Sequence, residues 1–266
     1  MKIKRFSEFE GCDLASKFDN YETFSVPKNV KDQLAYPDLV VVRPAVGNMK
    51  FGEFMDLVEG KNNPNNMSAY LEYSSIREYF PELEYDLDEM PFASDILRLS
   101  HLNIWISNGR TLGKLHFDPF DNFLCQLRGN KRLTIFEPHR NHDLYEAHIQ
   151  EAMLGYDPKS GKFRNHELLD STSMVMSPID ILNPDIDRFS NFTRAKPMEC
   201  YLNEGDVLFL PAFWWHEVQS YPNKIEERNL AVNFWYEPFL TKEFPCIDCK
   251  LDVNHSYRKL QERFST

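Results

Sequence analysis

Two histidines and one aspartate are the residues whose types and spacing most clearly suggest chemistry. His116 and Asp118 are two positions apart, so both side chains project to the same face of an extended chain. His216 lies far downstream, among aromatic residues at the start of a strand-like run. Two histidines and one carboxylate can bind non-haem Fe(II) and leave three coordination positions open. The triplet also occurs by chance, and a histidine among aromatic residues is often a packed core residue, so the spacing alone leaves both interpretations open.

Lys131 and Asn233 are further polar residues in apolar surroundings. Lys131 starts the arm that follows the turn 128–131, where a jelly roll could direct its ammonium group into the barrel that the triad faces. A buried ammonium is costly unless an anion pairs with it. In the run 229–236, alternation places Asn233 on one face with Trp235. An amide in the middle of an apolar strand requires a polar partner, so both residues are candidates for a binding cavity.

The segments that must position these residues have mainly strand composition. The helical spacing of apolar residues is confined to 51–59 in the first quarter of the chain, and the turns 128–131 and 203–206 have residues suited to hairpins. Short strands are expected at 38–43, 68–73, 102–107, 121–127, 132–136, 198–202, 207–210, 215–220 and 229–236. This pattern predicts a mainly β fold, a double-stranded β-helix (jelly roll or cupin) with flanking helices.

The domain organisation that we expect is one catalytic domain with short flanks. Residues 1–35 would form an N-terminal flank, 36–240 the cupin domain and 241–266 a C-terminal tail. Between 138 and 197 the strand pattern dissolves, which predicts a polar insertion that is helical or irregular. Four histidines fall in that insertion: His139, His142, His148 and His166.

Charge and composition exclude several classes of protein. With 30 Lys and Arg against 41 Asp and Glu, the net charge of −11 disfavours nucleic acid and suits a cationic partner. No apolar run approaches the roughly 18 residues that a bilayer crossing needs, and no secretory signal is recognisable. Five scattered cysteines indicate reduced thiols, and the pair at 246 and 249 has no partner motif. We therefore expect a protein of the cytoplasm or nucleus.

Three segments, taken together, resemble the JmjC-domain, cupin-fold 2-oxoglutarate oxygenases. They are 116–132 (HFDPFDNFLCQLRGNKR), 205–216 (GDVLFLPAFWWH) and 232–236 (VNFWY). The resemblance runs from about residue 43 to residue 238. It extends to the small lysyl hydroxylases of that family in the segments 50–60, 69–72 and 103–105.

The resemblance implies a role for each candidate residue. His116, Asp118 and His216 would be the Fe(II) ligands. Lys131 and Tyr70 would hold the distal carboxylate of 2-oxoglutarate, Asn122 and Asn233 would stand beside it, and Trp235 would form a wall of the site. Gly113 stands where this subgroup often has a threonine that helps to bind the cosubstrate, and Thr111 is a candidate substitute. The N-terminal region typical of the lysyl hydroxylases is not recognisable in residues 1–42, so substrate binding or dimer formation could differ.

The implied activity is an Fe(II)- and 2-oxoglutarate-dependent dioxygenase that uses O₂ and releases succinate and CO₂. Its expected substrate is a protein or peptide, basic in charge, with lysine as the first residue to test. The alternatives are an N-methyl-lysine demethylase, a tRNA hydroxylase and a cupin that binds metal without turnover. Acidity and the lack of a basic tail disfavour the tRNA hydroxylase. No membrane partner is expected, and a homodimer is left open.

Overall fold

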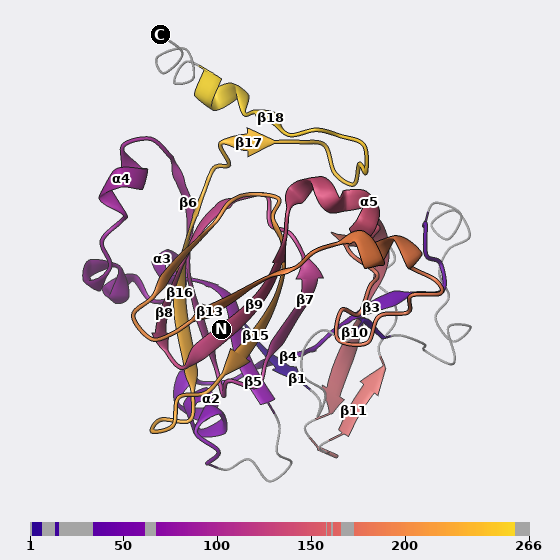
Figure 1. Cartoon of the computed structure of the whole chain (residues 1–266). Coiled ribbons are helices and arrows are strands. Elements are labelled where there is room, and N and C mark those ends of the chain that lie inside the picture. Colours follow the sequence, from indigo (N-terminus) through magenta and orange to yellow (C-terminus); the bar gives the residue numbers. More distant parts are fainter. Residues whose placement is uncertain are drawn as a thin grey trace.

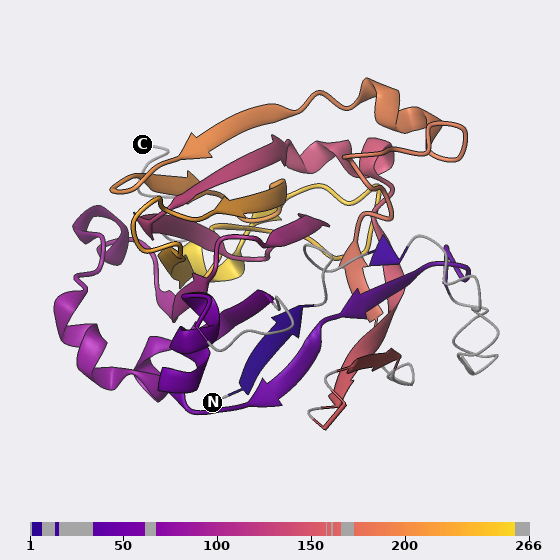
Figure 2. The same ribbon diagram turned by 90° about the horizontal axis from the view of Figure 1, so that it is seen from below.

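The computed structural model, which describes residues 2–6, 14–15, 34–61, 68–157, 159–160, 162–165 and 173–258, is built around three β-sheets. Two of the sheets, with seven and four strands, pack face to face, and Figure 2 shows them as two layers. This arrangement confirms the predicted mainly β, cupin-like fold. None of the helices in the described part of the chain is long and apolar enough to span a bilayer.

The two facing sheets are built from strands that are far apart in the sequence (Figure 1). The seven-stranded sheet has the order β14 (Val207–Leu210), β8 (Asp121–Arg128), β16 (Asn229–Tyr236), β6 (Leu99–Ser107), β5 (Ser68–Ser75), β1 (Lys2–Phe6) and β4 (Ala45–Asn48). The four-stranded sheet has the order β13 (Met198–Leu202), β9 (Asn130–Phe136), β15 (Trp215–Tyr221) and β7 (Leu112–His116).

The turns at 128–131 and 203–206 cross from one sheet to the other. β8 pairs with β14 in one sheet, while β9 pairs with β13 in the other, so the prediction of hairpin turns is wrong. In a double-stranded β-helix such turns form the corners of the barrel. The corner residue Gly129 has φ of 73°, and a Cβ atom there would lie 2.4 Å from the Tyr221 carbonyl oxygen. Glycine is therefore required at this position.

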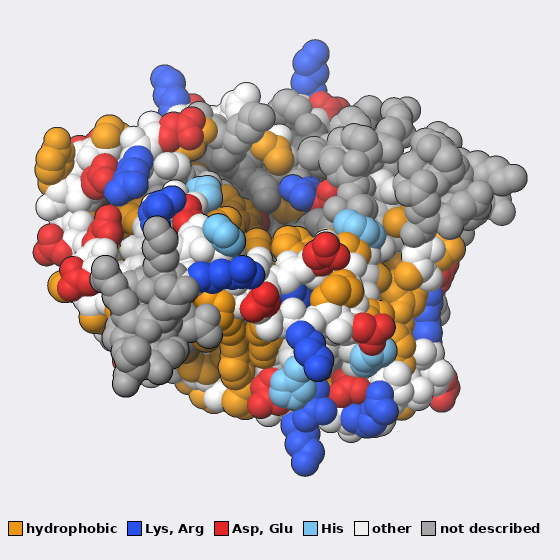
Figure 3. Space-filling view, turned by 90° about the horizontal axis from the view of Figure 1, so that it is seen from above, with side chains coloured by type: hydrophobic (Ala, Val, Ile, Leu, Met, Phe, Trp, Pro, Cys, Tyr) orange, Lys and Arg blue, Asp and Glu red, His pale blue; other side chains and the backbone are white. Residues whose placement is uncertain are grey.

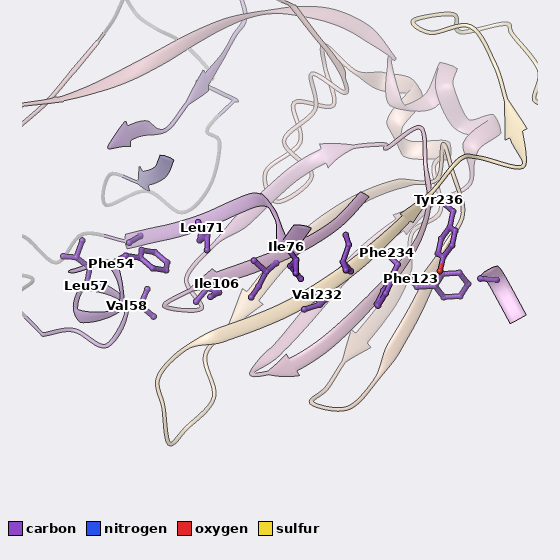
Figure 4. Packing of buried hydrophobic residues seen from close by; sticks show 14 residues of the cluster. Phe54, Leu57, Val58, Leu71, Ile76, Ile106, Phe123, Val232, Phe234 and Tyr236 are labelled. Carbon is purple, nitrogen blue, oxygen red and sulfur yellow. The ribbon is translucent and has the colours of Figure 1, made fainter. Parts of the chain in front are cut away.

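Helices cover the outer face of the seven-stranded sheet and bury an apolar core there. They are α2 (Phe51–Val58), α3 (Ile76–Tyr79), η2 (Pro81–Asp86) and α4 (Pro91–Ser94). The helix expected at 51–59 is confirmed, and its buried Phe54, Leu57 and Val58 face this core. β16 contributes Val232, Phe234 and Tyr236 to the same core, which Figure 4 shows from close by. Because side chains alternate along a strand, the residues between them face the barrel interior.

The segment 138–197 contains helical and irregular parts, as predicted, but it also contains strands that the sequence analysis did not predict. β10 (Ala147–Asp157), β11 (Lys162–Asn165) and β12 (Ser173–Met176) join β3 (Val40–Arg43) and β2 (Leu14–Ala15) in a five-stranded sheet. The sequence analysis missed β10 because this strand contains polar residues. Gln150 and Glu151 are nevertheless buried, and Glu151 forms an ion pair with Arg43. The helical parts are η3 (Pro138–Arg140), α5 (Asn141–Leu144) and η4 (Ser190–Arg194). His166 lies outside the described residues.

The C-terminal part forms a small arm over one end of the barrel (Figure 1). It contains β17 (Leu240–Thr241), β18 (Asp252–Val253) and η5 (His255–Tyr257). Cys246 and Cys249, both in the segment that connects β17 to β18, form a disulfide. The expectation of reduced thiols is therefore wrong for this pair. Cys125 and Cys200 are free thiols, as expected, and Cys12 lies outside the described residues.

Candidate active site

Two neighbouring strands of the four-stranded sheet bring the candidate metal ligands together. His116 ends β7 and is the direct cross-strand partner of His216 on β15, with ring centroids 4.4 Å apart. Asp118 follows β7, and its carboxylate oxygens lie 4.0 Å from His116 Nε2 and 3.6 Å from His216 Nε2. One donor atom from each residue lies within 4.8 Å of the others. Within the described ranges, this is the one group of His, Cys, Asp and Glu side chains with such spacing.

Hydrogen bonds to the backbone orient both imidazole rings. His116 Nδ1 lies 2.6 Å from the Lys114 carbonyl oxygen, and His216 Nδ1 lies 2.9 Å from the Trp214 carbonyl oxygen. Because a carbonyl only accepts, each Nδ1 carries the proton and each Nε2 presents a lone pair. The residues thus offer two imidazole nitrogens and a carboxylate oxygen on one side, a donor set that suits Fe(II).

Burial and mutual charge set the protonation of this group. Burial lowers the pKa of His116, and the nearby His216 lowers it further. Burial alone would raise the pKa of Asp118, but its electrostatic interactions with His216 and His116 outweigh the effect of burial and lower the pKa. Neutral His116 beside an ionised Asp118 is the protonation state that metal binding requires.

The triad lines a cavity of about 120 Å³ between the two facing sheets, and all the other predicted site residues line it too. Lys131 is 4% exposed and donates a hydrogen bond to Ser220 Oγ at 2.7 Å. Among the described residues no carboxylate pairs with it, and burial lowers its pKa to about 7. Ser220 stands four residues along β15 from His216, so the Cα atoms of these two residues are roughly 13 Å apart.

Three asparagine side chains in the barrel wall form a row of hydrogen-bonded amides, which we call the amide chain. Asn233 Nδ2 donates to Asn122 Oδ1 at 3.1 Å, while Asn233 Oδ1 accepts from Trp105 Nε1 at 2.7 Å and from Asn103 Nδ2 at 3.3 Å. The polar partner expected for Asn233 is therefore Asn122, and the two amides hold each other in place. Both side chains are buried, so their orientation is fixed before any ligand enters.

Aromatic residues form the wall of the cavity. Trp235 is stacked on Phe120, with centroids 4.9 Å apart and planes at 10°, and Tyr70 packs against Trp105 at 5.9 Å. The indole N–H of Trp235 is buried, and it has no hydrogen-bond partner among the described residues. An unpaired buried donor in a binding cavity can be satisfied by a bound ligand.

Sequence reasoning missed several residues of this cavity. Ser220 shares one face of β15 with His216 and Val218, and this period of two could have identified it. No sequence pattern could have identified Tyr73 as a cavity residue. It lies in a β-bulge between Leu71 and Ser74 and has a φ of 52°, and this local backbone turns it toward the cavity. Its ring lies 4.6 Å from Trp105 and 5.4 Å from Trp235.

The unusual glycine and its candidate substitute also lie in the cavity wall. A Cβ atom on Gly113 would meet no atom closer than 3.8 Å, so the site has room for a side chain there. Thr111 is buried and lines the same cavity as Lys131. Thr111 therefore supplies a hydroxyl-bearing residue to the cavity wall although position 113 has none.

Comparison with known proteins agrees with this geometry. The cupin-like domain family matches residues 7–242. The bifunctional peptidase and (3S)-lysyl hydroxylase JMJD7 of Homo sapiens is 26% identical over 222 residues, which covers 82% of this chain and 65% of that protein. The tRNA wybutosine-synthesizing protein 5 of Mus musculus is 32% identical over 171 residues, with 61% and 42% covered. The lysine-specific demethylase 8 of Danio rerio is 34% identical over 135 residues, with 51% and 27% covered.

The chain spans less than two thirds of the length of each of these relatives. The family match itself covers most of the chain and includes every candidate ligand and every residue of the amide chain. Fold, site and relatives thus agree, and the chain belongs to the family of cupin-like JmjC domains.

Proposed function

We propose that this protein is an Fe(II)- and 2-oxoglutarate-dependent dioxygenase that hydroxylates a side chain of a protein substrate, with lysine as the first candidate. One observation carries the proposal. Three side chains that can bind a metal line the same cavity as Lys131, a buried lysine that has no carboxylate partner among the described residues. A cupin that only binds metal has no need for a buried cation of this kind. A buried ammonium is stabilised when an anion enters and pairs with it.

Each residue of the site then has a defined role. His116, Asp118 and His216 would hold Fe(II), and Lys131 with Tyr70 would bind the distal carboxylate of 2-oxoglutarate. Together, the metal and cosubstrate supply the oxidation of an unactivated C–H bond by O₂, with succinate and CO₂ as co-products. Asn122 and Asn233 present fixed amides beside the cosubstrate, while Trp235 and its aromatic neighbours exclude water from the cavity.

A protein substrate is supported by the relatives and by overall charge. JMJD7 is named a lysyl hydroxylase, and the net charge of −11 favours a basic peptide. The charge is not gathered on the face seen in Figure 3, where described acidic and basic side chains are interspersed. Attraction over a distance is therefore a weaker guide to the substrate than the cavity itself.

N-methyl-lysine demethylation is the second candidate, because one relative is named a lysine-specific demethylase and the metal chemistry would be the same. The tRNA relative raises a third candidate, which the net negative charge disfavours.

A single assay separates the first two reactions. The protein is incubated with Fe(II), 2-oxoglutarate, ascorbate and basic peptides that carry either lysine or methyl-lysine. We expect a gain of one oxygen mass on the unmodified peptides, and His216→Ala is the control for metal-independent oxidation. Formaldehyde and loss of methyl mass from the methylated peptides, with no oxygen gain on the others, would assign the protein to the demethylases.

A further inference from the structure

The aromatic residues next to the candidate ligands in sequence lie together on the back of the four-stranded sheet. Phe117 stands between His116 and Asp118, and Trp215 directly precedes His216. Both are buried in one apolar cluster with Phe213. Neighbours along a strand point to opposite faces, so the packing of this back cluster fixes the backbone that carries the ligands.

Contacts within this cluster connect the segment that carries His116 and Asp118 with the segment that carries His216. The Phe117 ring lies edge-on to Trp215 at 4.9 Å and 5.6 Å from the Phe213 ring. The Phe213 backbone N–H donates to the Asp118 carbonyl oxygen at 2.9 Å. A displacement of Phe117 would therefore move both neighbouring ligands.

Residues 240–251, which we call the C-terminal clasp, close this cluster from outside. The clasp passes over the end of the barrel beside α5 in Figure 1. Lys242 Nζ lies 5.0 Å from the Phe117 centroid and 5.9 Å from that of Phe213. The Phe244 ring lies 5.5 Å and 5.9 Å from the same two rings. The clasp thus contacts the residue between two candidate ligands.

A buried ion pair anchors the clasp. Lys242 Nζ lies 2.7 Å from Glu146 Oε2, and the two side chains are 1% and 0% exposed. The other oxygen of Glu146 accepts a hydrogen bond from the Cys246 backbone N–H at 3.3 Å. One carboxylate therefore holds both the cation over Phe117 and the first cysteine of the disulfide.

The disulfide between Cys246 and Cys249 closes the loop that supplies this N–H. Both cysteines are partly exposed, and Cys249 borders a cavity of about 300 Å³ that is also lined by His139, His142 and Lys250. A reducing thiol can reach the sulfur atoms from this side.

We propose that the disulfide-closed clasp positions the His116 to Asp118 segment from behind, and that reduction of the disulfide weakens metal binding. The inference rests on the metal site of the proposed function. In the reduction, a dithiol donates two electrons and two protons: the S–S bond breaks, Cys246 and Cys249 become thiols, and the dithiol becomes a disulfide. Lys242 and Phe244 act as positioning residues, since they contact Phe117 and do not line the cavity of the candidate active site.

Metal binding by the unaltered protein is the first test. The dissociation constant for Mn(II) is measured by electron paramagnetic resonance, without peptide or cosubstrate, before and after treatment with a dithiol, and free thiols are counted in both samples. We expect the dissociation constant to rise on the order of tenfold after reduction, the size typical when a residue that supports a ligand is lost. The double variant Cys246→Ser, Cys249→Ser should have the same dissociation constant for Mn(II) as the reduced protein, and the dithiol should not change it. Cys200→Ser should behave like the unaltered protein.

A pair of matched variants tests the positioning role. Phe244→Ala removes the ring that contacts Phe117, whereas Phe239→Ala removes a ring of the same arm that packs on Tyr257. Phe244→Ala should weaken Mn(II) binding several-fold and change the Mn(II) spectrum, while Phe239→Ala should leave both unchanged. Equal effects of the two variants would overturn the positioning role.

The outcomes distinguish this inference from the proposed function. Unchanged Mn(II) affinity after complete reduction overturns the clasp and leaves the oxygenase assignment standing. Redox-sensitive metal binding without hydroxylation of any peptide supports the clasp and overturns the assigned reaction. A protein that binds no Mn(II) at all would overturn both.

Discussion

The two faces of β16 show how one strand serves two different purposes. Val232, Phe234 and Tyr236 point into the apolar core under the helices. Asn233 and Trp235, which alternate with them, point into the barrel and line the cavity of the candidate active site. The outer face buries hydrocarbon in close packing, which stabilises the fold. The inner face buries amides and faces a buried ammonium, which costs stability and prepares a binding site. Substitutions on the two faces should therefore have separable effects.

The largest effect is expected at the metal site. His216→Ala removes one of three donors, so succinate production should fall to background and Mn(II) binding should be lost. Thermal unfolding of the metal-free protein should change little by comparison, because the site is built for binding and not for stability. Turnover, bound metal and melting temperature are measured on the same preparation. Unchanged metal content would remove His216 from the coordination sphere.

The outer face should respond in the opposite way. Phe234→Ala creates a cavity in the apolar core, and the free energy of unfolding should fall by about 3–5 kcal/mol. Urea titration gives this value, and Mn(II) affinity is measured below the unfolding transition. The folded fraction should bind Mn(II) as the unaltered protein does. A large loss of metal affinity in Phe234→Ala would show that the two faces are coupled.

Lys131, on β9, lines the same cavity as the inner face of β16, and its substitution should have two effects. Lys131→Met removes a charge-assisted contact worth about 1.5–3 kcal/mol, so 2-oxoglutarate should bind the Mn(II) protein roughly ten- to a hundredfold more weakly. The same change removes an unpaired buried charge, so the unliganded variant should be more stable than the parent. Calorimetric titration and urea unfolding measure the two effects. Unweakened binding would mean that the cosubstrate is anchored elsewhere.

A pH dependence of stability has the same origin, with a small effect at each pH step. Burial lowers the pKa of Lys131 from 10.5 to about 7, so between these values the unfolded chain holds a proton that the folded protein has lost. The free energy of unfolding should therefore rise with pH across this window, by at most about 1.4 kcal/mol per pH unit from this group. Below pH 7 the buried charge is present in full and its contribution to the slope disappears. Comparing urea unfolding of the parent with Lys131→Met isolates the effect, and parallel pH profiles would contradict it.

Local sequence patterns predicted the parts of the molecule that depend on alternation. The strands, the helix at Phe51–Val58 and the two faces of β16 follow from the spacing of apolar residues. That spacing also placed His116 and Asp118 on one face, although their meeting with His216 depends on a cross-strand register that no local pattern contains. The roles of Tyr70 and Asn122 came from the family resemblance alone and remain predictions.

Long-range packing decided the parts that were predicted wrongly. β10 reads as a polar segment because its buried Glu151 is matched by Arg43, which lies far away in the sequence. The corner turns have hairpin chemistry, yet they cross between sheets because each strand finds its partner in another segment. Tyr73 reaches the cavity through a bulge, which shifts the alternation by one residue.

The central place of β16 also has a consequence for folding. Asn233 is hydrogen bonded to Asn103 and Asn122, which lie 130 and 111 residues earlier in the chain. During synthesis β6 and β8 are therefore made without the strand that fills the gap between them, and each keeps an unpaired edge until residue 236 has left the ribosome. Contacts between residues so far apart in the sequence make folding slow. His216, on β15, is also made late in synthesis. The three candidate metal ligands can therefore come together only after β15 has been made.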